Sequence, residues 1–390
     1  LSSRFSIYDS ADQREAMKLA IKDANLDSKN WTPGSVAAAI SKAKNHLIDA
    51  AIYAGRANDF HTRSIAKVFA AYEKILKKNE ALDFDDLLLV TARLLKEQQT
   101  VREELQQRFQ YIMIDEYQDT NYAQFVIAHS LASAHKNICV VGDPDQSIYG
   151  WRGADIRNIL EFEEHYSSAK IIPLGQNFRS TGHIVQAAAT LIANNKRRKH
   201  KKLHTELGDG EKPNIHTCRD EHDEAQLILD EFRKRNEQQQ VPWREMAVLY
   251  RVNALSRVLE EAFRNANIPY IIARGTAFYE RKEIKDALAY LRLTANPNDE
   301  VSLRRIINVP ARGIGGTTLD KIELFAINNQ LTLFDALRAA RRVGDLSTKA
   351  SGAIAKFVAT VDSWREAASG SGLVTAERAP LAELVERIVQ

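Results

Sequence analysis

Residues 112–121 read IMIDEYQDTN, and this stretch decides how the rest of the chain is interpreted. A short apolar run ends in two adjacent carboxylates, Asp115 and Glu116, and polar residues follow. In a magnesium nucleotide site, one carboxylate of such a pair holds the metal while its neighbour polarises a water molecule. For this pair alone, the alternative is an ordinary exposed acidic turn.

Such a site normally needs a glycine-rich phosphate loop, G-x-x-x-x-G-K-[ST], and none of the 390 residues form one. The chain begins LSSRFSIYDS, without Met, and ends LAELVERIVQ, inside the pattern of an amphipathic helix. We therefore expect an excised piece of a longer protein, with the phosphate loop outside these residues.

The composition indicates an ordinary soluble globular protein, with 44% hydrophobic and 27% charged residues. A chain of this length predicts roughly two to four domains. No apolar run reaches the roughly 18–20 residues that span a bilayer, which argues against a membrane protein. Cys139 and Cys218 predict buried thiols in a reducing compartment, and the Cys and His spacing predicts no zinc site. The net charge of +3 does not by itself indicate nucleic-acid binding.

The pattern of apolar residues changes at about residue 109. Before it, helical spacing predicts helices in SADQREAMKLAIKDAN (10–25), TRSIAKVFAAYEKILKKN (62–79) and DFDDLLLVTARLLKEQQ (83–99). After it, the apolar runs YIMI (111–114), NICVVGD (137–143) and AKIIPLG (169–175) alternate with helical AQFVIAHSLASA (123–134) and IRNILEFEEHY (156–166). This alternation predicts an α/β fold with a parallel sheet, in which ligands bind beyond the carboxyl ends of the strands.

A second α/β stretch is expected over about residues 182–292. Its predicted strands are EMAVLYRV (245–252) and PYIIARG (269–275), and ALSRVLEEAFRNAN (254–267) is the helix between them. From about residue 293 the pattern is helical again, interrupted by the glycine turn in RGIGGTTLDKI (312–322).

The segment VVGDPDQSIYGWRGAD (140–155) places Gln146 at the same sheet edge as the carboxylate pair. A glutamine amide both donates and accepts, which suits contact with a terminal phosphate or its attacking water. Tyr149 and Trp151 offer flat faces on which a base gains about 1–3 kcal/mol by stacking. Both rings could instead belong to the core, but the Gly, Asp, Pro, Ser and Arg residues around them favour exposure.

A third segment, GQNFRST (175–181), contains Arg179, whose guanidinium can clamp phosphate oxygens. Taken alone, an arginine of this kind is more often part of a surface ion pair. Arg179 becomes a candidate site residue because its segment comes third along the chain, after the carboxylate pair and the glutamine turn.

Four segments together resemble motifs II, III and IV and the block after them in the UvrD/PcrA/Rep group of superfamily 1A DNA helicases. They are DEYQDTN, VVGDPDQSIYGWRGADI, LGQNFRST and FYERKEIKDALAYLRLTANP. FSIYDSADQ and LDFDDLL also resemble the first inserted domain of that group. The resemblance implies RecA-like parallel-sheet motor domains of the P-loop NTPase type, here incomplete, with inserted all-helical subdomains. The implied parts are residues 1–82 (1B-like), 83–174 (1A-like), 175–292 (2A-like) and 293–390 (2B-like), and motifs V and VI are missing.

The resemblance implies ATP and Mg²⁺ as cofactors. Asp115 would hold Mg²⁺, and Glu116 would activate the attacking water and act on the metal only indirectly. Gln146 would contact the γ-phosphate, and Arg179 would be an arginine finger, a group worth about 10³–10⁵ in rate. Phe178 would stack on the adenine, where the family usually has tyrosine.

Implied DNA contacts lie in two places. Tyr149 and Trp151 would stack on single-stranded bases, with Arg152 near the strand and the nucleotide. In the glycine turn, the backbone amides of Gly313, Gly315 and Gly316 would approach a phosphate, and Thr317 or Thr318 would cap the next helix. A plain tight turn is the alternative there. The basic run KRRKHKK (196–202) could bind phosphate or simply form a solvated face.

The implied activity is ATP-dependent 3′→5′ DNA helicase and translocase action in repair or replication. The expected partners are single-stranded DNA, its junction with duplex DNA, and repair or replication proteins. We expect a monomer or weak dimer, without a membrane, in the bacterial cytoplasm near the nucleoid. Because the phosphate loop is missing, we expect these 390 residues alone not to hydrolyse ATP. The alternative is a non-catalytic fragment that binds nucleic acid or another protein.

Overall fold

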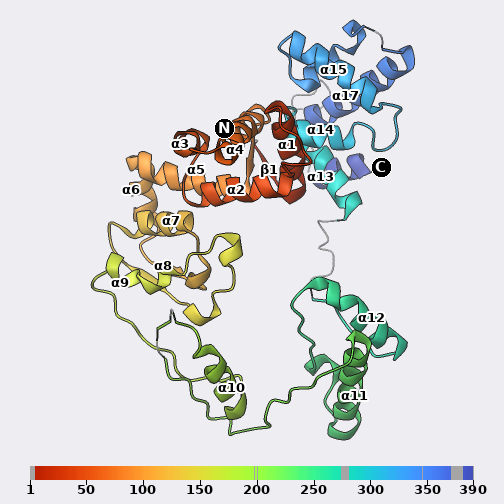
Figure 1. Ribbon diagram of the computed structural model, residues 1–390. Coiled ribbons are helices and arrows are strands. Elements are labelled where there is room, and N and C mark those ends of the chain that lie inside the picture. The colour runs from red at the N-terminus through yellow and green to blue at the C-terminus, as the bar shows by residue number, and fades with distance from the viewer. Residues whose placement is uncertain are drawn as a thin grey trace. The chain divides into compact units, whose positions relative to one another are not determined.

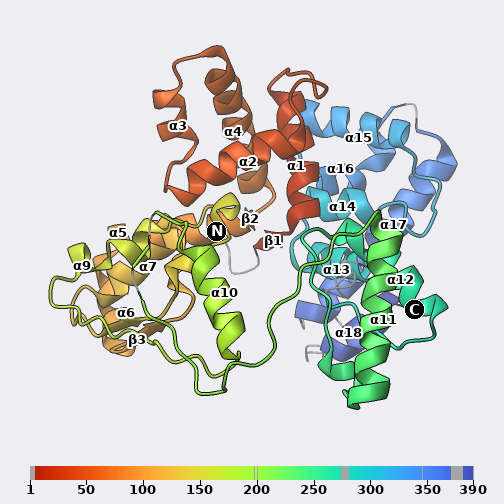
Figure 2. The same ribbon diagram turned by 60° about the horizontal axis from the view of Figure 1, so that its bottom comes forward.

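The computed structural model describes residues 5–196, 198–199, 201–273, 281–344, 346–369 and 381–389 (Figures 1 and 2). The chain divides into two compact units. The first comprises Leu1–Ile171, Arg197–Lys199 and Tyr279–Gln390, and the second comprises Ile172–Lys196 and His200–Phe278. The predicted four-part division is finer than these two units and stays a prediction.

Helices dominate the first unit, and its strands are short. The strands are β1 (Ser6–Tyr8), β2 (Ala81–Asp83), β3 (Ile112–Ile114) and β4 (Ile138–Val140). The helices before residue 170 are α1 (Ser10–Asp23), α2 (Pro33–Asn45), α3 (Ala50–Arg56), α4 (Phe60–Lys78), α5 (Phe84–Glu97), α6 (Gln99–Arg108), α7 (Tyr122–Ala132), α8 (Arg157–Leu160) and α9 (Phe162–His165). Those near the C-terminus are α13 (Lys282–Ala295), α14 (Glu300–Ile306), α15 (Gly316–Asn328), α16 (Leu333–Arg338), α17 (Thr348–Ser369) and α18 (Leu381–Val389).

Two parallel strand pairs organise the first unit. β1 pairs with β2, and β3 pairs with β4 in a register that sets Met113 opposite Cys139. The predicted strands at YIMI and NICVVGD are therefore confirmed, and so is their parallel direction. The prediction that the cysteines are buried is wrong, because Cys139 is exposed and Cys218 is half-buried. Met113 and Cys139 share one face of the strand pair, and no described residue covers that face enough to bury them.

The second unit contains α10 (Gly182–Ile192), α11 (Glu221–Gln239) and α12 (Ser256–Asn265). Of the strands predicted around it, AKIIPLG and EMAVLYRV are not strands. Residues 269–273 of PYIIARG are not a strand either, and its last two residues lie outside the described part. Only an isolated bridge forms, between Gln176 and His204. A β-strand requires backbone hydrogen bonds to a neighbouring strand, and no described residues form such a neighbour for these runs. Leu249 and Ile271 are therefore left exposed.

Local sequence signals explain where the site-bearing helices begin. Asp83 is the N-cap of α5 and forms a capping box with Asp86, and Asn121 forms the same arrangement with Gln124 at α7. Each box satisfies free amides at a helix start. These caps fix the points where β2 passes into α5 and where the turn after β3 passes into α7.

A buried ion cluster joins α2 to the start of α5. The Lys44 ammonium is fully buried and lies 2.8 Å from an Asp83 oxygen and 2.7 Å from an Asp86 oxygen. Burial alone raises the pKa of Asp83, but the Lys44 charge holds it below its usual value. Burial raises the pKa of Asp86 to about 6. The Tyr72 hydroxyl donates to Asp83 at 2.9 Å, so the cluster also reaches α4.

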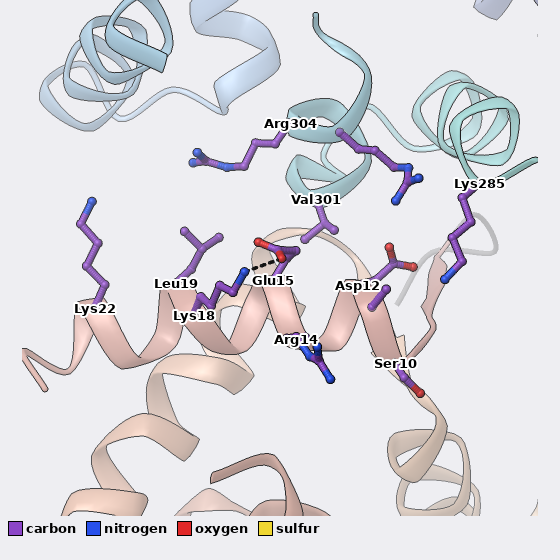
Figure 3. A pocket seen from close by; sticks show the side chains of 12 residues that line it. Ser10, Asp12, Arg14, Glu15, Lys18, Leu19, Lys22, Lys285, Val301 and Arg304 are labelled. Carbon is purple, nitrogen blue, oxygen red and sulfur yellow. Dashed lines mark hydrogen bonds and ion pairs between the residues drawn. The ribbon is translucent and has the colours of Figure 1, made fainter. Parts of the chain in front are cut away.

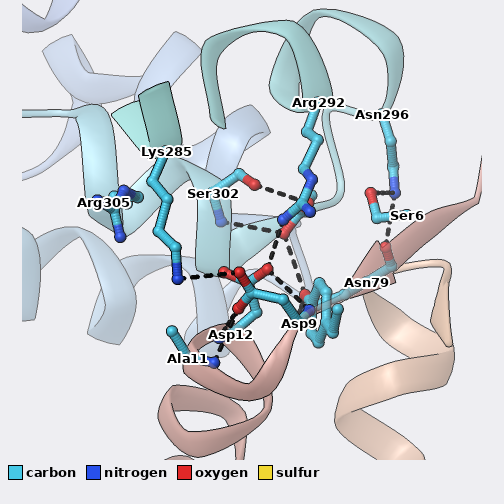
Figure 4. A network of polar contacts seen from close by, with 12 residues as sticks. Ser6, Asp9, Ala11, Asp12, Asn79, Lys285, Arg292, Asn296, Ser302 and Arg305 are labelled. Carbon is cyan, nitrogen blue, oxygen red and sulfur yellow. Dashed lines mark hydrogen bonds and ion pairs between the residues drawn. The ribbon is translucent and has the colours of Figure 1, made fainter. Parts of the chain in front are cut away.

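A polar network connects α1, the end of β1 and the end of α4 to α13 and α14 (Figure 4). In both ribbon views, α13 and α14 lie beside α1 (Figures 1 and 2). Asp12 forms an ion pair with Arg292, and Tyr8 donates to Asp299 at 3.0 Å. Asn296 donates to the carbonyl oxygen of Asn79 at 2.7 Å. These contacts connect residues more than 200 positions apart and hold the two helical layers together.

Apolar packing supports the same arrangement. One core cluster lies among α1, α2 and α4 and includes Val301 of α14. A second cluster lies among α13 to α17. Within the described part of the chain, no helix is both long and apolar enough to cross a membrane.

Candidate functional site: the carboxylate pair and the glutamine turn

The carboxylate pair lies in the turn directly after β3. Asp115 and Glu116 are both exposed, and an Asp115 oxygen accepts the Glu116 backbone N–H at 2.8 Å. Glu116 has a φ of 51° and a ψ of 40°, in the left-handed region that residues with a Cβ rarely adopt. Such strain persists only where the surroundings enforce it, and it concentrates at functional sites. The next residue enforces it, because Tyr117 is buried and its N–H donates to the Val141 carbonyl at 3.0 Å.

Gln118 connects this turn to the turn after β4. Its side chain is 1% exposed, and its amide nitrogen donates to Glu116 Oε2 at 2.8 Å. Its amide oxygen accepts the backbone N–H of Asp143 at 3.0 Å. Gln118 therefore positions the Glu116 carboxylate relative to the second turn. Inspection of the sequence singled out its neighbours and missed Gln118 itself.

The backbone of the two turns meets at Gly142. A Cβ on this residue would lie 2.5 Å from the Gln118 amide oxygen and 2.8 Å from the end of Ile159. Only glycine fits there without displacing a neighbour, so the close contact of the two turns depends on the Gly142 that precedes Asp143.

Gln146 lies at the end of the second turn and is exposed. Its amide donates to Asp143 Oδ2 at 2.8 Å. The structure thus links Glu116, Gln118, Asp143 and Gln146 by successive hydrogen bonds at the carboxyl ends of β3 and β4. The expected neighbourhood of Gln146 and the carboxylate pair is present in the first unit.

Arg198 supports the same turn through Asp145. Its guanidinium donates to Asp145 Oδ2 at 2.9 Å, and the two side chains are only 11% and 7% exposed. Lys199 pairs with Glu163 at 2.8 Å. These two members of the basic run are therefore engaged in ion pairs and do not form a free phosphate-binding face. Arg197 and His200 of that run lie outside the described residues.

The aromatic residues of the following segment are accessible. Trp151 is 72% exposed, and Tyr149 is half-buried. The Arg152 guanidinium lies over both rings, 4.7 Å from the Trp151 centroid and 5.5 Å from the Tyr149 centroid. The rings therefore do not belong to a sealed core, and Trp151 presents a free face. Contact with DNA stays a prediction.

Phe178 and Arg179 belong to the second unit. Phe178 is 78% exposed, Arg179 is exposed as well, and no ion pair joins Arg179 to a described carboxylate. An Asn177 oxygen accepts the backbone N–H groups of Arg179 and Ser180, at 2.9 and 2.8 Å, and fixes the local turn. Both side chains are available for binding, and their roles toward ATP stay predictions.

The glycine turn differs from expectation in one respect. α15 begins at Gly316 with Gly315 as its N-cap and without a side-chain cap. The prediction that Thr317 or Thr318 caps this helix is wrong, because both lie inside its first turn. Gly313 has a φ of 75°, and no described neighbour lies within 4 Å of a Cβ built on it. The turn is thus open, as a backbone contact with phosphate requires, and that contact stays a prediction.

The residues present fit a magnesium ion held largely by a nucleotide. No group of three or more His, Cys, Asp or Glu side chains among the described residues could hold a metal by itself. Mg²⁺ commonly takes only one or two carboxylates and completes its shell with phosphate oxygens and water. Asp115 is exposed and forms no ion pair with a described cation, which leaves its second oxygen available.

Comparison with known proteins identifies the class. The family model for the UvrD/REP helicase N-terminal domain matches residues 1–167, and the model for the UvrD-like helicase C-terminal domain matches residues 172–343. The chain belongs to the UvrD-like helicase family.

The chain is similar to proteins named ATP-dependent DNA helicase PcrA. It is 46% identical to that of Staphylococcus aureus over 363 residues, which cover 93% of this chain and 50% of the relative. It is 48% identical to that of Staphylococcus epidermidis over 344 residues, which cover 88% of this chain and 47% of the relative. The chain thus spans about half the length of these curated relatives.

Proposed function

We propose that the protein containing these residues is an ATP-dependent DNA helicase that translocates 3′→5′ along single-stranded DNA in repair or replication. The supporting observation is the hydrogen-bonded series from Glu116 through Gln118 and Asp143 to Gln146. It connects a carboxylate suited to activating water with an amide suited to contacting a terminal phosphate. The accessible Trp151 face follows five residues later on the same segment.

The proposed chemistry assigns distinct tasks to these side chains. A bound Mg²⁺ would neutralise charge on the phosphate oxygens, and Asp115 would hold it. Glu116 would orient the attacking water and accept its proton. Gln118 keeps one Glu116 oxygen engaged, which leaves the other for water. Gln146 would sense the γ-phosphate and transmit its loss to the segment that carries Trp151.

The remaining proposed roles belong to two side chains of the second unit. Arg179 would stabilise charge on the transferred phosphoryl group, and Phe178 would stack on the adenine. The family relationship and their accessible side chains support both assignments. The finer fold assignment, two RecA-like motor domains with inserted helical subdomains, belongs to the same proposal, as do the monomeric or weakly dimeric state and the nucleoid-associated location.

The 390 residues alone are proposed to bind DNA without hydrolysing ATP, because they contain no phosphate loop. Purified chain should bind single-stranded oligonucleotides and show no DNA-stimulated release of phosphate from ATP. Stimulated hydrolysis by these residues would contradict that part of the proposal.

Directional unwinding tests the proposed activity in a protein that joins these residues to a phosphate loop. Duplexes with a single-stranded 3′ tail, a 5′ tail or no tail would be offered with ATP and Mg²⁺. We expect unwinding of the 3′-tailed duplex only. Preference for the 5′ tail, or unwinding of RNA alone, would contradict the proposed polarity or substrate.

A further inference from the structure

Asn45, the last residue of α2, is a buried amide whose two ends contact two different segments of the first unit. Its side chain is 4% exposed. The Oδ1 atom accepts the side-chain N–H of Asn121 at 2.6 Å. A Cβ built on Gly153 would lie 3.1 Å from the Nδ2 atom and 3.4 Å from Cγ. Asn45 therefore lies between the start of α7 and the end of the short turn Gly150–Arg152, which carries Trp151.

The contact with Asn121 acts on the residue at which the turn after β3 passes into α7. Asn121 Oδ1 accepts the Gln124 backbone N–H at 2.9 Å and caps the helix. The cap uses only the oxygen of this amide, so the nitrogen remains to donate to Asn45. The bond between the two amides therefore holds the Asn121 side chain in the orientation that the cap requires.

The contact with Gly153 acts on the segment that carries Trp151. Gly153 has a φ of 89°, in the left-handed region that favours glycine, and Asn45 occupies the space beside it. Two residues later, the Asp155 backbone N–H donates to the Thr120 carbonyl at 2.9 Å. The end of the Trp151 segment is thus held at two neighbouring points, once by backbone and once by the Asn45 side chain.

Lys44 fixes the end of α2 from which Asn45 projects. Its buried ammonium forms the ion pairs with Asp83 and Asp86 at the start of α5. Successive residues of a helix point about 100° apart, so Lys44 faces α5 while Asn45 faces the other two segments. A short side chain on an anchored helix end holds its neighbours more precisely than a long one on a loop would.

The space that Asn45 fills is separate from the pocket of about 810 Å³ between α1 and α14. Figure 3 shows that pocket, with Leu19 and Lys22 on α1 and Arg304 on α14 among its lining residues. Neither Asn45 nor the residues that it contacts belong to this lining. Truncating Asn45 would therefore remove atoms from between α7 and the Trp151 segment and would not enlarge the pocket.

We propose that Asn45 is a positioning residue for single-stranded DNA binding, which sets the place of the Trp151 segment relative to the turn after β3. It contacts neither DNA nor nucleotide and acts through Gly153 and Asn121. The inference rests on the proposed stacking of a base on Trp151. It assigns a role in that contact to a residue of α2, 76 positions before Asn121.

A double-mutant cycle in the full 390-residue chain separates positioning from a general loss of structure. Affinity for a fluorescent oligothymidine would be measured by anisotropy for wild type, N45A, W151A and N45A/W151A. If Asn45 acts through the Trp151 ring, N45A weakens binding only while that ring is present. We expect N45A to lose about 5-fold or more of the roughly 5- to 150-fold that one stacked base supplies. We expect no further loss when N45A is added to W151A.

A second variant breaks the same bond from the other side. Asn121→Ser removes the amide that donates to Asn45, and α7 stays capped because serine is an equally favoured N-cap residue. Circular dichroism and urea unfolding would identify which variants are folded. N121S should weaken oligothymidine binding with the same dependence on Trp151, so the proposal is tested even where N45A does not fold.

Asn296→Ala is the matched control. Asn296 is also a buried asparagine, 2% exposed, and its hydrogen bonds go to Ser6 and to the carbonyl oxygen of Asn79 (Figure 4). This variant loses a buried amide of the same kind in the same unit. We expect it to keep the wild-type affinity for oligothymidine.

The position of the Trp151 ring is also measurable without DNA. A chain labelled with 5-fluorotryptophan contains four labelled rings, and the W151F variant identifies the fluorine resonance of Trp151. We expect N45A to shift that resonance and N296A to leave it in place. Both variants should leave the resonance of Trp243, in the second unit, unchanged.

Several results would overturn the role of Asn45. They are equal affinity of wild type and folded N45A, a further loss when N45A is added to W151A, an equal loss in N296A, and an unchanged Trp151 resonance in folded N45A. Each of these leaves oligothymidine binding by the wild-type chain intact. Absence of that binding in wild type would instead contradict the proposed function itself.

Discussion

The side-chain oxygen of Gln118 accepts the backbone N–H of Asp143 at 3.0 Å, and this bond connects the turn after β3 to the turn after β4. The same side chain donates to Glu116 at 2.8 Å. A buried neutral amide, which donates and accepts at once, thus links a carboxylate to the backbone of a neighbouring motif.

Replacing Gly142 by Ala tests how closely these turns pack. The added Cβ would overlap the Gln118 oxygen, and overpacking of this kind costs about 1–3 kcal/mol. We expect a free energy of unfolding lower by that amount, measured by chemical denaturation. Gly150→Ala is the control, because a Cβ there has no described neighbour within 4 Å. Equal stability of the two variants would contradict the packing described.

Replacing Arg198 by Ala would leave the Asp145 carboxylate buried without its partner. Breaking a buried pair typically costs about 3–5 kcal/mol. The neighbouring Lys199→Ala change breaks a pair that is 36% and 49% exposed, and such pairs contribute less than about 1 kcal/mol. Thermal unfolding should separate the two variants clearly. Similar, small effects would mean that Arg198 does not support the turn.

The Lys44 cluster predicts a pH-dependent stability. Lys44→Met would bury two carboxylates without a counter-charge, at a cost of about 3–5 kcal/mol near neutral pH. The exposed Lys42→Met change is the control and should have little effect. Urea unfolding at several pH values would measure both.

The sign of the pH effect follows from the two carboxyl groups. The folded-state pKa of Asp83 is lowered, so its contribution to stability is present above its unfolded pKa and lost as the pH falls. The pKa of Asp86 is raised to about 6, so its contribution is present at low pH and lost as the pH rises through about 6. Without Lys44 both groups favour their protonated form, and the deficit of K44M should shrink as the pH falls below about 6. A deficit independent of pH would contradict this account.

Trp151→Ala tests the aromatic face. Loss of one stacked base should weaken binding of a single-stranded oligonucleotide by about 1–3 kcal/mol, roughly 5- to 150-fold. Phe84→Ala is the control, because Phe84 is also a large exposed ring and lies outside the segment. Anisotropy titrations of both variants measure the difference. Equal binding by wild type and W151A would rule out stacking on Trp151.

The sequence predicted the elements whose evidence is local. YIMI and NICVVGD became β3 and β4, and the helical spacing of residues 62–79 became α4. The strand predictions for AKIIPLG and EMAVLYRV are wrong because a strand also needs a neighbouring strand. Apolar composition cannot reveal whether such a neighbour is present. β1 and β2 were not predicted, because SIY (6–8) and ALD (81–83) mix polar with apolar residues and form no apolar run.

Site residues were predictable where the residue type itself indicates the chemistry. They were not predictable where the role depends on a contact with a residue distant in the sequence. Glu116, Gln146 and Trp151 stand out by residue type. Gln118 lies within DEYQDTN, but its role depends on contact with a backbone amide 25 residues later. Arg198 was hidden in a charge run that also suits a solvated surface.

Single-turnover ATP hydrolysis by Glu116→Gln tests the central claim most directly. The change would be made in a longer chain that joins these residues to a phosphate loop, with ATP, Mg²⁺ and single-stranded DNA present. We expect a rate reduced by at least about 100-fold with ATP binding retained, because glutamine keeps the shape but cannot accept the proton of the attacking water. The matched change Glu164→Gln, at an exposed glutamate of α9, should leave the rate at the wild-type value. A wild-type rate in E116Q would show that the carboxylate after β3 is not the catalytic base.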